Sequence, residues 1–199
     1  MAFTDNFGNP QGFLGRLMLV AMEREHLLMA RWAFPQFDVP QEGQIADIGC
    51  GGGYNVKRLL QKSAAAKVWG LDISEESVKK ARKVNKAAPL IRCEILQASV
   101  EDLPFSDGQL AFATAFETVF FWKDIERGFK EVHRVLKAGA AFAVVNNYGD
   151  PKIDWKKKVP CMKRQTAEEI KEHLLATGFS SATIAKNGNL FCVIAVKQE

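Results

Sequence analysis

The sequence predicts an α/β protein built on a doubly wound, mostly parallel sheet of seven strands. Short apolar runs alternate with helical patterns along most of the chain, the order expected when helices connect parallel strands. A glycine-rich stretch, residues 49–53, joins the first of these runs to a helical pattern. Asn187, Gly188 and Asn189 separate the last two apolar runs. This spacing is typical of a hairpin, so we expect the final strand to run antiparallel.

Each expected element follows from its local pattern. Apolar runs predict strands near residues 44–48, 67–72, 92–98, 109–116, 140–147, 181–186 and 190–196. Periodic patterns predict helices near residues 54–63, 75–86, 124–137 and 166–177, and Ser74 supplies an N-cap for the second of them. With 199 residues, of which 47% are hydrophobic, the chain can bury a substantial core. We therefore expect a single domain over residues 1–199.

The segment IADIGCGGGYNVKRLL, residues 45–60, carries the strongest functional signal. Glycine tolerates positive φ and has no Cβ, so the backbone here can lie close to a bound molecule. The free N–H groups of the following helix point back toward the same place. We interpret this segment as the loop for a nucleotide-type cofactor; the alternative is a glycine-rich turn without a ligand.

The spacing of the glycines indicates which type of nucleotide cofactor the loop can bind. A dinucleotide loop needs glycine at its first, third and sixth positions, but the sixth position is Tyr54 counted from Gly49 and Val56 counted from Gly51. Asp47 precedes the loop by two residues, and its carboxylate repels a pyrophosphate while it attracts a cationic or amino-bearing ligand. These features favour S-adenosylmethionine over NAD.

With these residues the sequence resembles the class I S-adenosylmethionine-dependent methyltransferases, of the small-molecule type with a DIGCGGG loop. Two further segments match in the expected order: KVWGLDIS, residues 67–74, and ASVEDLPFSDGQ, residues 98–109. The resemblance covers roughly residues 45–141. It implies a Rossmann-like fold with the strand order 3-2-1-4-5-7-6. It also implies S-adenosyl-L-methionine as cofactor and S-adenosyl-L-homocysteine as product.

The resemblance also assigns residues to the cofactor. Asp72 is expected to accept hydrogen bonds from both ribose hydroxyls, and Ser99 stands where the family usually has an aspartate for the adenine amino group. The chain departs from the family again at Ala111, which replaces an aspartate, and in LKAGA, residues 136–140, which replaces an LKPGG turn. The cofactor-binding candidates are Asp47, Gly49, Cys50, Gly51, Gly53, Tyr54, Asn55, Asp72, Ile73, Ser74, Ser99, Val100, Glu101, Ala115 and Phe116.

The expected reaction is in-line transfer of the sulfonium methyl group to a nucleophilic O, N, S or C atom of a small acceptor. Such a displacement needs alignment in a dry pocket more than covalent help. His26 and Glu117 are the candidate proton acceptors. The candidate substrate contacts are Phe13, Phe120, Phe121, Trp122 and Tyr148, although the aromatic run 120–122 fits core packing equally well. No metal is expected, because the four cysteines are widely spaced and form no C-x-x-C pair.

Two regions stand outside the matched segments. Residues 1–43 include a helical pattern from about Gly12 to Trp32 and are expected to form an N-terminal helical lid over a cofactor-binding core of residues 44–199. His26 in this region also fits a structural role. Residues 152–164 carry six basic side chains and one acidic one in a chain of net charge +4. That segment fits a solvated loop or the recruitment of an anionic substrate or RNA. We expect residues 148–164, which contain it, to form the lid together with the N-terminal helix.

The sequence therefore predicts methyl transfer to a small molecule; the alternatives are an RNA or protein methyltransferase and a catalytically silent S-adenosylmethionine-binding module. Nucleic acid is an unlikely partner, because AFETVFFW, residues 115–122, replaces the DPPY-type tetrapeptide of methyltransferases that act on nucleic-acid amino groups. No membrane-spanning segment is expected, since Arg16 interrupts the apolar N-terminal stretch. We expect a cytoplasmic monomer or homodimer with reduced thiols.

Overall fold

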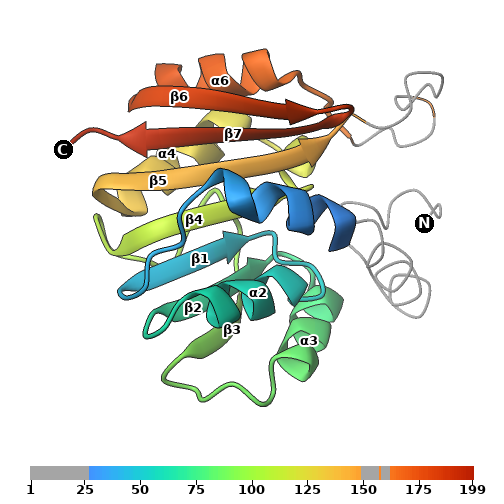
Figure 1. The fold of residues 1–199 in the computed structure, drawn as a ribbon, viewed down its shortest axis with the longest axis vertical. Coiled ribbons are helices and arrows are strands. Elements are labelled where there is room, and N and C mark those ends of the chain that lie inside the picture. The colour runs from blue at the N-terminus through green and yellow to red at the C-terminus, as the bar shows by residue number, and fades with distance from the viewer. Residues whose placement is uncertain (1–26, 149–156, 158–161) are drawn as a thin grey trace.

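A seven-stranded sheet with the order β3-β2-β1-β4-β5-β7-β6 forms the centre of the molecule (Figure 1). The computed structural model describes residues 27–148, 157 and 162–199. The strands are β1 (Gln44–Ile48), β2 (Lys67–Asp72), β3 (Cys93–Gln97), β4 (Leu110–Phe116), β5 (Leu136–Asn147), β6 (Phe179–Asn187) and β7 (Leu190–Lys197). This order confirms the predicted fold class.

Helices follow the strands as the sequence predicts. They are α2 (Tyr54–Lys62), α3 (Glu75–Val84), α4 (Ile125–Val135) and α6 (Ala167–Ala176), with short 3-10 turns η2 (Phe34–Gln36) and η3 (Val119–Phe121). Residues 27–33 are also helical. Ser74 caps α3, because its side chain accepts a hydrogen bond from the backbone N–H of Ser77. Each of these α-helices and strands overlaps its expected range.

Strand directions bring one set of strand ends together. β1 pairs in parallel with β2 and β4, β2 with β3, and β4 with β5, whereas β7 runs antiparallel to β5 and β6. Asn187 pairs with Leu190, so Gly188 lies in a tight hairpin turn with φ of 57°. The carboxyl ends of the parallel strands meet at one edge of the sheet, which is where doubly wound proteins bind ligands.

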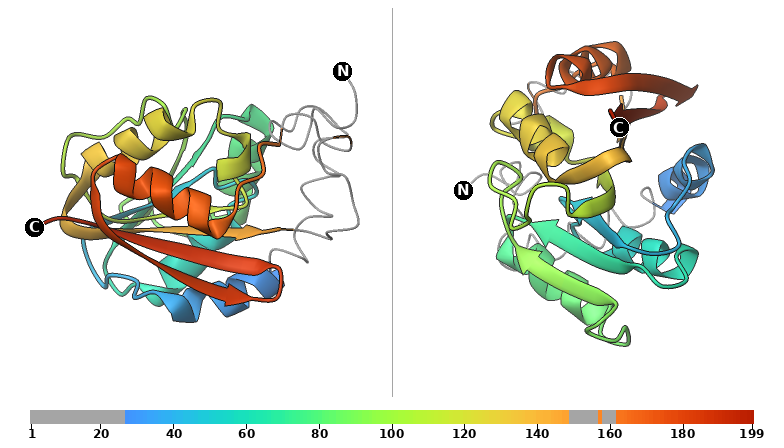
Figure 2. Two further views of the ribbon diagram at one scale, coloured as in Figure 1. Left: turned by 90° about the horizontal axis from the view of Figure 1, so that it is seen from above. Right: turned by 90° about the vertical axis from the view of Figure 1, so that its left-hand side faces the viewer.

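Helices cover both faces of the sheet (Figure 2). Alternate residues of β5 show the division: Phe142 and Val144 pack with α4 and α6, while Ala143 and Val145 pack with α2, α3 and residues 29–34. Because both sides are buried, the central strands read as nearly continuous apolar runs, such as LAFATAF in β4.

The junction between α4 and β5 differs from the expected one. We predicted a helix to residue 137 and a strand from residue 140, but α4 ends at Val135 and Leu136 already pairs with Leu110 of β4. The register then shifts between Leu110 and Phe112. Ala138 stands where the family has proline and retains its N–H, so the strand can begin before the positive φ of Gly139. The LKAGA segment is therefore the start of β5.

The described part of the N-terminal region belongs to the core. Met29, Ala33 and Phe34 are buried, and the Phe34 ring stacks on Phe116 with centroids 5.7 Å apart. The predicted lid depends on residues 1–26 and 149–161, which, apart from Lys157, lie outside the described residues, so the lid stays a prediction. Among the residues that the structure describes, no helix combines the length and apolarity needed to cross a bilayer.

Candidate cofactor and acceptor site

Backbone hydrogen bonds attach the glycine loop to the end of β2. The N–H groups of Gly49 and Cys50 both donate to the carbonyl oxygen of Leu71, at 2.7 and 2.8 Å. The N–H of Gly51 donates to Asp72 Oδ2 at 2.8 Å. On the other side, Asn85 Nδ2 at the end of α3 donates to the carbonyl oxygen of Gly53 at 2.9 Å. The loop is thus fixed from two neighbouring elements.

The loop glycines have different roles. A Cβ on Gly49 (φ 73°) would lie 2.1 Å from Thr118 Oγ1, and one on Gly53 (φ 78°) would lie 2.7 Å from the Ala81 Cβ. Packing within the protein therefore requires glycine at both positions. Gly51 has a φ of 51°, but among the residues that the structure describes a Cβ there would meet nothing within 4 Å. No described residue fills the space in front of Gly51, as expected of a position that faces a ligand.

Asp72 connects the loop to the next helix. Its Oδ2 accepts from Gly51 and its Oδ1 accepts from the N–H of Ser74 at 2.9 Å. Burial raises the pKa of Asp72 above its ordinary value, while these two N–H donors act in the opposite direction. A carboxylate has about four lone-pair sites, so Asp72 retains acceptor capacity that a ligand hydroxyl can use.

Asp47 is a buried acid below the loop. The residue is 1% exposed, and Thr114 Oγ1 of β4 donates to Asp47 Oδ1 at 2.8 Å. Burial raises the pKa of Asp47 to about 7; the Thr114 hydrogen bond lowers it, and the nearby Asp72 carboxylate raises it further. A cation close to this group would favour its ionised form.

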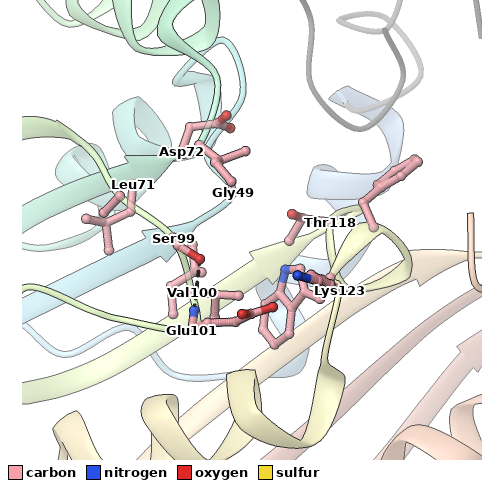
Figure 3. A pocket seen from close by; sticks show the side chains of 13 residues that line it. Gly49, Leu71, Asp72, Ser99, Val100, Glu101, Thr118 and Lys123 are labelled. Carbon is pink, nitrogen blue, oxygen red and sulfur yellow. Dashed lines mark hydrogen bonds between the residues drawn. The ribbon is translucent and has the colours of Figure 1, made fainter. Parts of the chain in front are cut away.

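A pocket opens at the carboxyl edge of the sheet beside this loop. Figure 3 shows Gly49 and Asp72 at one end, Ser99 and Glu101 along a wall, and Thr118 and Lys123 across from that wall. The predicted site residues that line it are Gly49, Asp72, Ile73, Ser99, Val100, Glu101, Phe121 and Trp122. Sequence reasoning missed Ile48, Leu71, Ala98, Thr118 and Lys123. The first three directly precede predicted residues, so adjacency along the chain was a usable signal for them.

Hydrogen bonds within a turn at Ser99 stabilise the pocket wall that this residue forms. Ser99 Oγ accepts the N–H of Glu101 at 3.2 Å, and the Ser99 carbonyl oxygen accepts the N–H of Asp102 at 3.2 Å. The Ser99 hydroxyl keeps its O–H donor and a further lone pair for a ligand. Ile73 forms an apolar rim of the pocket, with 54% of the residue exposed.

Several predicted residues do not line the pocket. Phe120 is 1% exposed and packs against Phe191 in the core, and the Tyr148 hydroxyl accepts the N–H of Ala167 at the start of α6. Cys50 is buried, and burial raises the pKa of its thiol well above the ordinary value, as befits a small packing residue. The others are Asp47, Gly51, Gly53, Tyr54, Asn55, Ser74, Ala115 and Phe116, on the loop, the start of α2 or α3, or the strands.

Glu117 has an unusual backbone at the end of β4. It has a φ of 56°, a positive value that no other non-glycine residue shares among those the structure describes. Its N–H donates to the carbonyl oxygen of Val145 at 2.8 Å, and its Oε1 accepts the N–H of Asn147. Such backbone geometry concentrates at functional sites. Glu117 directly precedes Thr118, which lines the pocket, and it stays a candidate proton acceptor.

Two predicted site residues, His26 and Phe13, lie outside the described residues. Within the described ranges, no three His, Cys, Asp or Glu side chains gather where they could hold a metal ion.

The sheet order, the glycine loop between β1 and α2, and the pocket beside Asp72 define a doubly wound α/β protein of the nucleotide-cofactor-binding type. A family model described as "Methyltransferase domain" matches residues 46–144. The chain belongs to the class I S-adenosylmethionine-dependent methyltransferases, whose cofactor is S-adenosylmethionine. The predicted family and its cofactor are thereby confirmed.

Similar proteins differ in length from this chain. The ubiquinone/menaquinone biosynthesis C-methyltransferase UbiE of Geotalea uraniireducens is 30% identical over 143 residues, which cover 71% of this chain and 59% of that protein. Sterol methyltransferase-like 1 of Botryococcus braunii is 34% identical over 116 residues, covering 58% of this chain and 30% of that protein. The chain spans 29% to 66% of the length of the first curated relatives that it matches.

One solved structure shows the same fold over nearly the whole chain. It is a complex between the Haloferax volcanii Trm112 methyltransferase activator and a methyltransferase. The match has a TM-score of 0.78 and 20% identity, and it covers 92% of this chain and 94% of that one.

Proposed function

We propose that this protein binds S-adenosyl-L-methionine at the described pocket and transfers its methyl group to a small-molecule acceptor. The observation that carries the proposal is the 2.8 Å hydrogen bond from the Gly51 N–H to Asp72 Oδ2. It joins the backbone that would face the cofactor to the carboxylate that would receive its ribose.

The cofactor would extend along the pocket from the glycine loop at Gly49 to Ser99. Asp72 would accept the ribose hydroxyls, and Ser99 and Val100 would face the adenine, with Ile73 covering its apolar side. The amino-acid end, which carries an ammonium and the sulfonium, would lie at the glycine loop above Asp47. A buried acid is suited to that end because it attracts positive charge.

In the proposed reaction, a lone pair of the acceptor forms a bond to the methyl carbon while the carbon–sulfur bond breaks. The bonding electrons pass to sulfur, which gives neutral S-adenosyl-L-homocysteine, and the acceptor's proton passes to a base. Two residues are candidates for this base: Glu117, which the structure describes, and His26, which lies outside the described residues. Alignment of the three atoms in a dry pocket supplies about 7–11 kcal/mol in favourable cases. The aromatic rings of Phe121 and Trp122 supply a wall that excludes water and can face the cationic sulfur.

A small-molecule acceptor is supported by the names of the relatives, several of which are sterol or quinone methyltransferases. It is also supported by the apolar residues Phe121 and Trp122 at the pocket. The test is incubation with methyl-labelled cofactor and separate lipid, polar-metabolite, RNA and protein fractions of a cell extract. We expect label in one of the two small-molecule fractions, and label confined to RNA or protein would overturn this acceptor class.

The second candidate is a methyltransferase of RNA or protein that works with a partner. The Haloferax volcanii neighbour, which was solved with a methyltransferase activator, favours this alternative. A silent cofactor-binding module is the third, and it predicts binding of S-adenosylhomocysteine without transfer to any fraction.

Replacing Asp72 with alanine is expected to weaken the binding of S-adenosylhomocysteine by at least about tenfold, because charge-assisted hydrogen bonds to the ribose are lost. The glycine loop also loses its Gly51 anchor, so the thermal midpoint should fall as well. Calorimetric titration measures the first effect and a thermal melt the second. Unchanged affinity with a lower midpoint would make Asp72 purely structural.

We also propose that residues 1–199 form one domain, in which residues 1–43 are a lid on a core of residues 44–199. The proposal also includes a cytoplasmic location as a monomer or homodimer. The free state of Cys50, Cys93 and Cys192 supports a reducing compartment.

A further inference from the structure

We propose that Glu131 and Arg134 of α4 are positioning residues for the cofactor, although neither lines the pocket. They hold the loop after β3, whose first residues, Ser99, Val100 and Glu101, form a pocket wall. This inference rests on the proposed placement of the adenine against that wall.

The two side chains bind the backbone of the loop directly. Glu131 Oε2 accepts the N–H of Leu103 at 3.0 Å. Arg134 donates to the carbonyl oxygens of Leu103 and Phe105 at 3.2 and 2.9 Å, and to the Asp107 carboxylate at 2.7 Å. Glu131 also accepts from Arg134 Nε at 2.8 Å, so the acid and the base orient each other. One pair of side chains thus makes four hydrogen bonds to residues 103–107.

A third residue of α4 extends this attachment toward the pocket. Arg127 Nε donates to the carbonyl oxygen of Glu101 at 3.2 Å. Residues 127, 131 and 134 are spaced by four and three positions, so they lie along one face of the helix. That face therefore follows the loop from Glu101 to Asp107.

The attachment also joins opposite walls of the pocket. Glu101 Oε1 accepts the N–H of Asp124 at 3.2 Å, and Asp124 directly follows the lining residues Trp122 and Lys123. One helix thereby fixes the distance between the Ser99–Glu101 wall and the Phe121–Lys123 wall. Without these bonds, both walls would have to be ordered when the cofactor binds, and that ordering reduces affinity.

The chain contains a matched control in Arg92. It also donates to three backbone carbonyls of one loop, those of Ser63, Ala64 and Ala66, at 2.8, 2.7 and 2.7 Å. That loop joins α2 to β2 and does not contribute to the pocket lining. Arg92→Ala and Arg134→Ala therefore remove similar sets of hydrogen bonds. Only the bonds of Arg134 hold a loop that also contributes residues to the pocket lining.

The experiment compares these variants by calorimetric titration with S-adenosylhomocysteine and with 5′-methylthioadenosine, which lacks the amino-acid end. We expect both variants to melt at lower temperature. Arg134→Ala should weaken both ligands by about tenfold, whereas Arg92→Ala should change them by less than about twofold. Glu131→Gln retains the side-chain shape, and we expect the same direction with a smaller loss, which keeps the test decisive if Arg134→Ala does not fold.

Equal affinities of Arg134→Ala (or, should it not fold, Glu131→Gln) and Arg92→Ala for both ligands would overturn the inference. A loss for S-adenosylhomocysteine alone would also overturn it, because the loop would then act on the amino-acid end. The proposed placement of the cofactor fails separately, if Asp72→Ala binds both ligands as tightly as the natural protein does.

Discussion

Replacing Gly51 with valine is expected to weaken S-adenosylhomocysteine binding by about a hundredfold or more, equivalent to about 2.7 kcal/mol. The new side chain would occupy the space in front of the loop, where a Cβ meets no atom of the described residues within 4 Å. It would also disturb the Gly51 N–H that donates to Asp72. A calorimetric titration at fixed pH measures the loss.

The backbone itself supplies a competing explanation, because a β-branched residue is strained at positive φ. Gly188 provides the control: its φ of 57° is close to the 51° of Gly51, and within the described part of the chain a Cβ there also meets nothing within 4 Å. It lies in the β6–β7 hairpin, away from the pocket lining. Gly188→Val should show a comparable loss of thermal stability with normal binding. If the two variants bind alike, the space before Gly51 is not a ligand position.

The fold was predictable because each element has a local signal. Parallel strands buried on both faces give apolar runs, and the hairpin at Gly188 gives a turn signal, so strand positions and the last strand's direction follow from the sequence. The α4–β5 junction was less predictable. There the first residue of β5 depends on which backbone N–H groups can pair with β4. The pairing of Leu136 with Leu110 joins residues far apart in the sequence, so no local sequence pattern indicates it.

The candidate site was predictable where it follows a motif and not where it depends on packing. Asp72 was predicted from its distance to the glycine loop, and Ser99 from the resemblance of residues 98–109 to the corresponding family segment. Thr114, the partner of Asp47, is 67 residues away along the chain and reaches it only because β1 pairs with β4 in the register that opposes these two residues. The aromatic residues 120–122 have different environments that the sequence could not distinguish, because they depend on the packing of the η3 turn. Phe120 is buried in the core, whereas Phe121 and Trp122 line the pocket.

Asp47 is expected to make the free protein less stable as the pH rises from about 4 to about 7. Its pKa is about 7 in the folded protein and has the ordinary value of 3.8 in the unfolded chain. Between these values the unfolded chain has lost the proton and the folded protein still holds it. Unfolding then releases a proton, so higher pH favours the unfolded chain. The contribution amounts to about 4 kcal/mol when both forms are ionised.

Asp47→Asn should remove this dependence, because the amide carries no charge and its oxygen can still accept the Thr114 hydroxyl. We expect the free variant to be more stable than the natural protein at pH 8, by up to about 4 kcal/mol, and similar to it at pH 4. Urea unfolding of both proteins at several pH values measures the difference, in which the contributions of groups that do not interact with Asp47 cancel. Two stability curves that stay parallel from pH 4 to pH 8 would show that Asp47 does not titrate in this range.

Cofactor binding should depend on pH in the opposite direction. The positive charges of S-adenosylmethionine favour the ionised form of Asp47, so binding should release a proton below about pH 7, and affinity should increase as the pH rises through that value. Asp47→Asn should bind more weakly at pH 8 and lose this increase, because it has no proton to release. Calorimetry in buffers of different ionisation enthalpy measures the released proton directly. Equal proton release by both proteins would place the cofactor's charged end away from Asp47 and would require another acid to receive it.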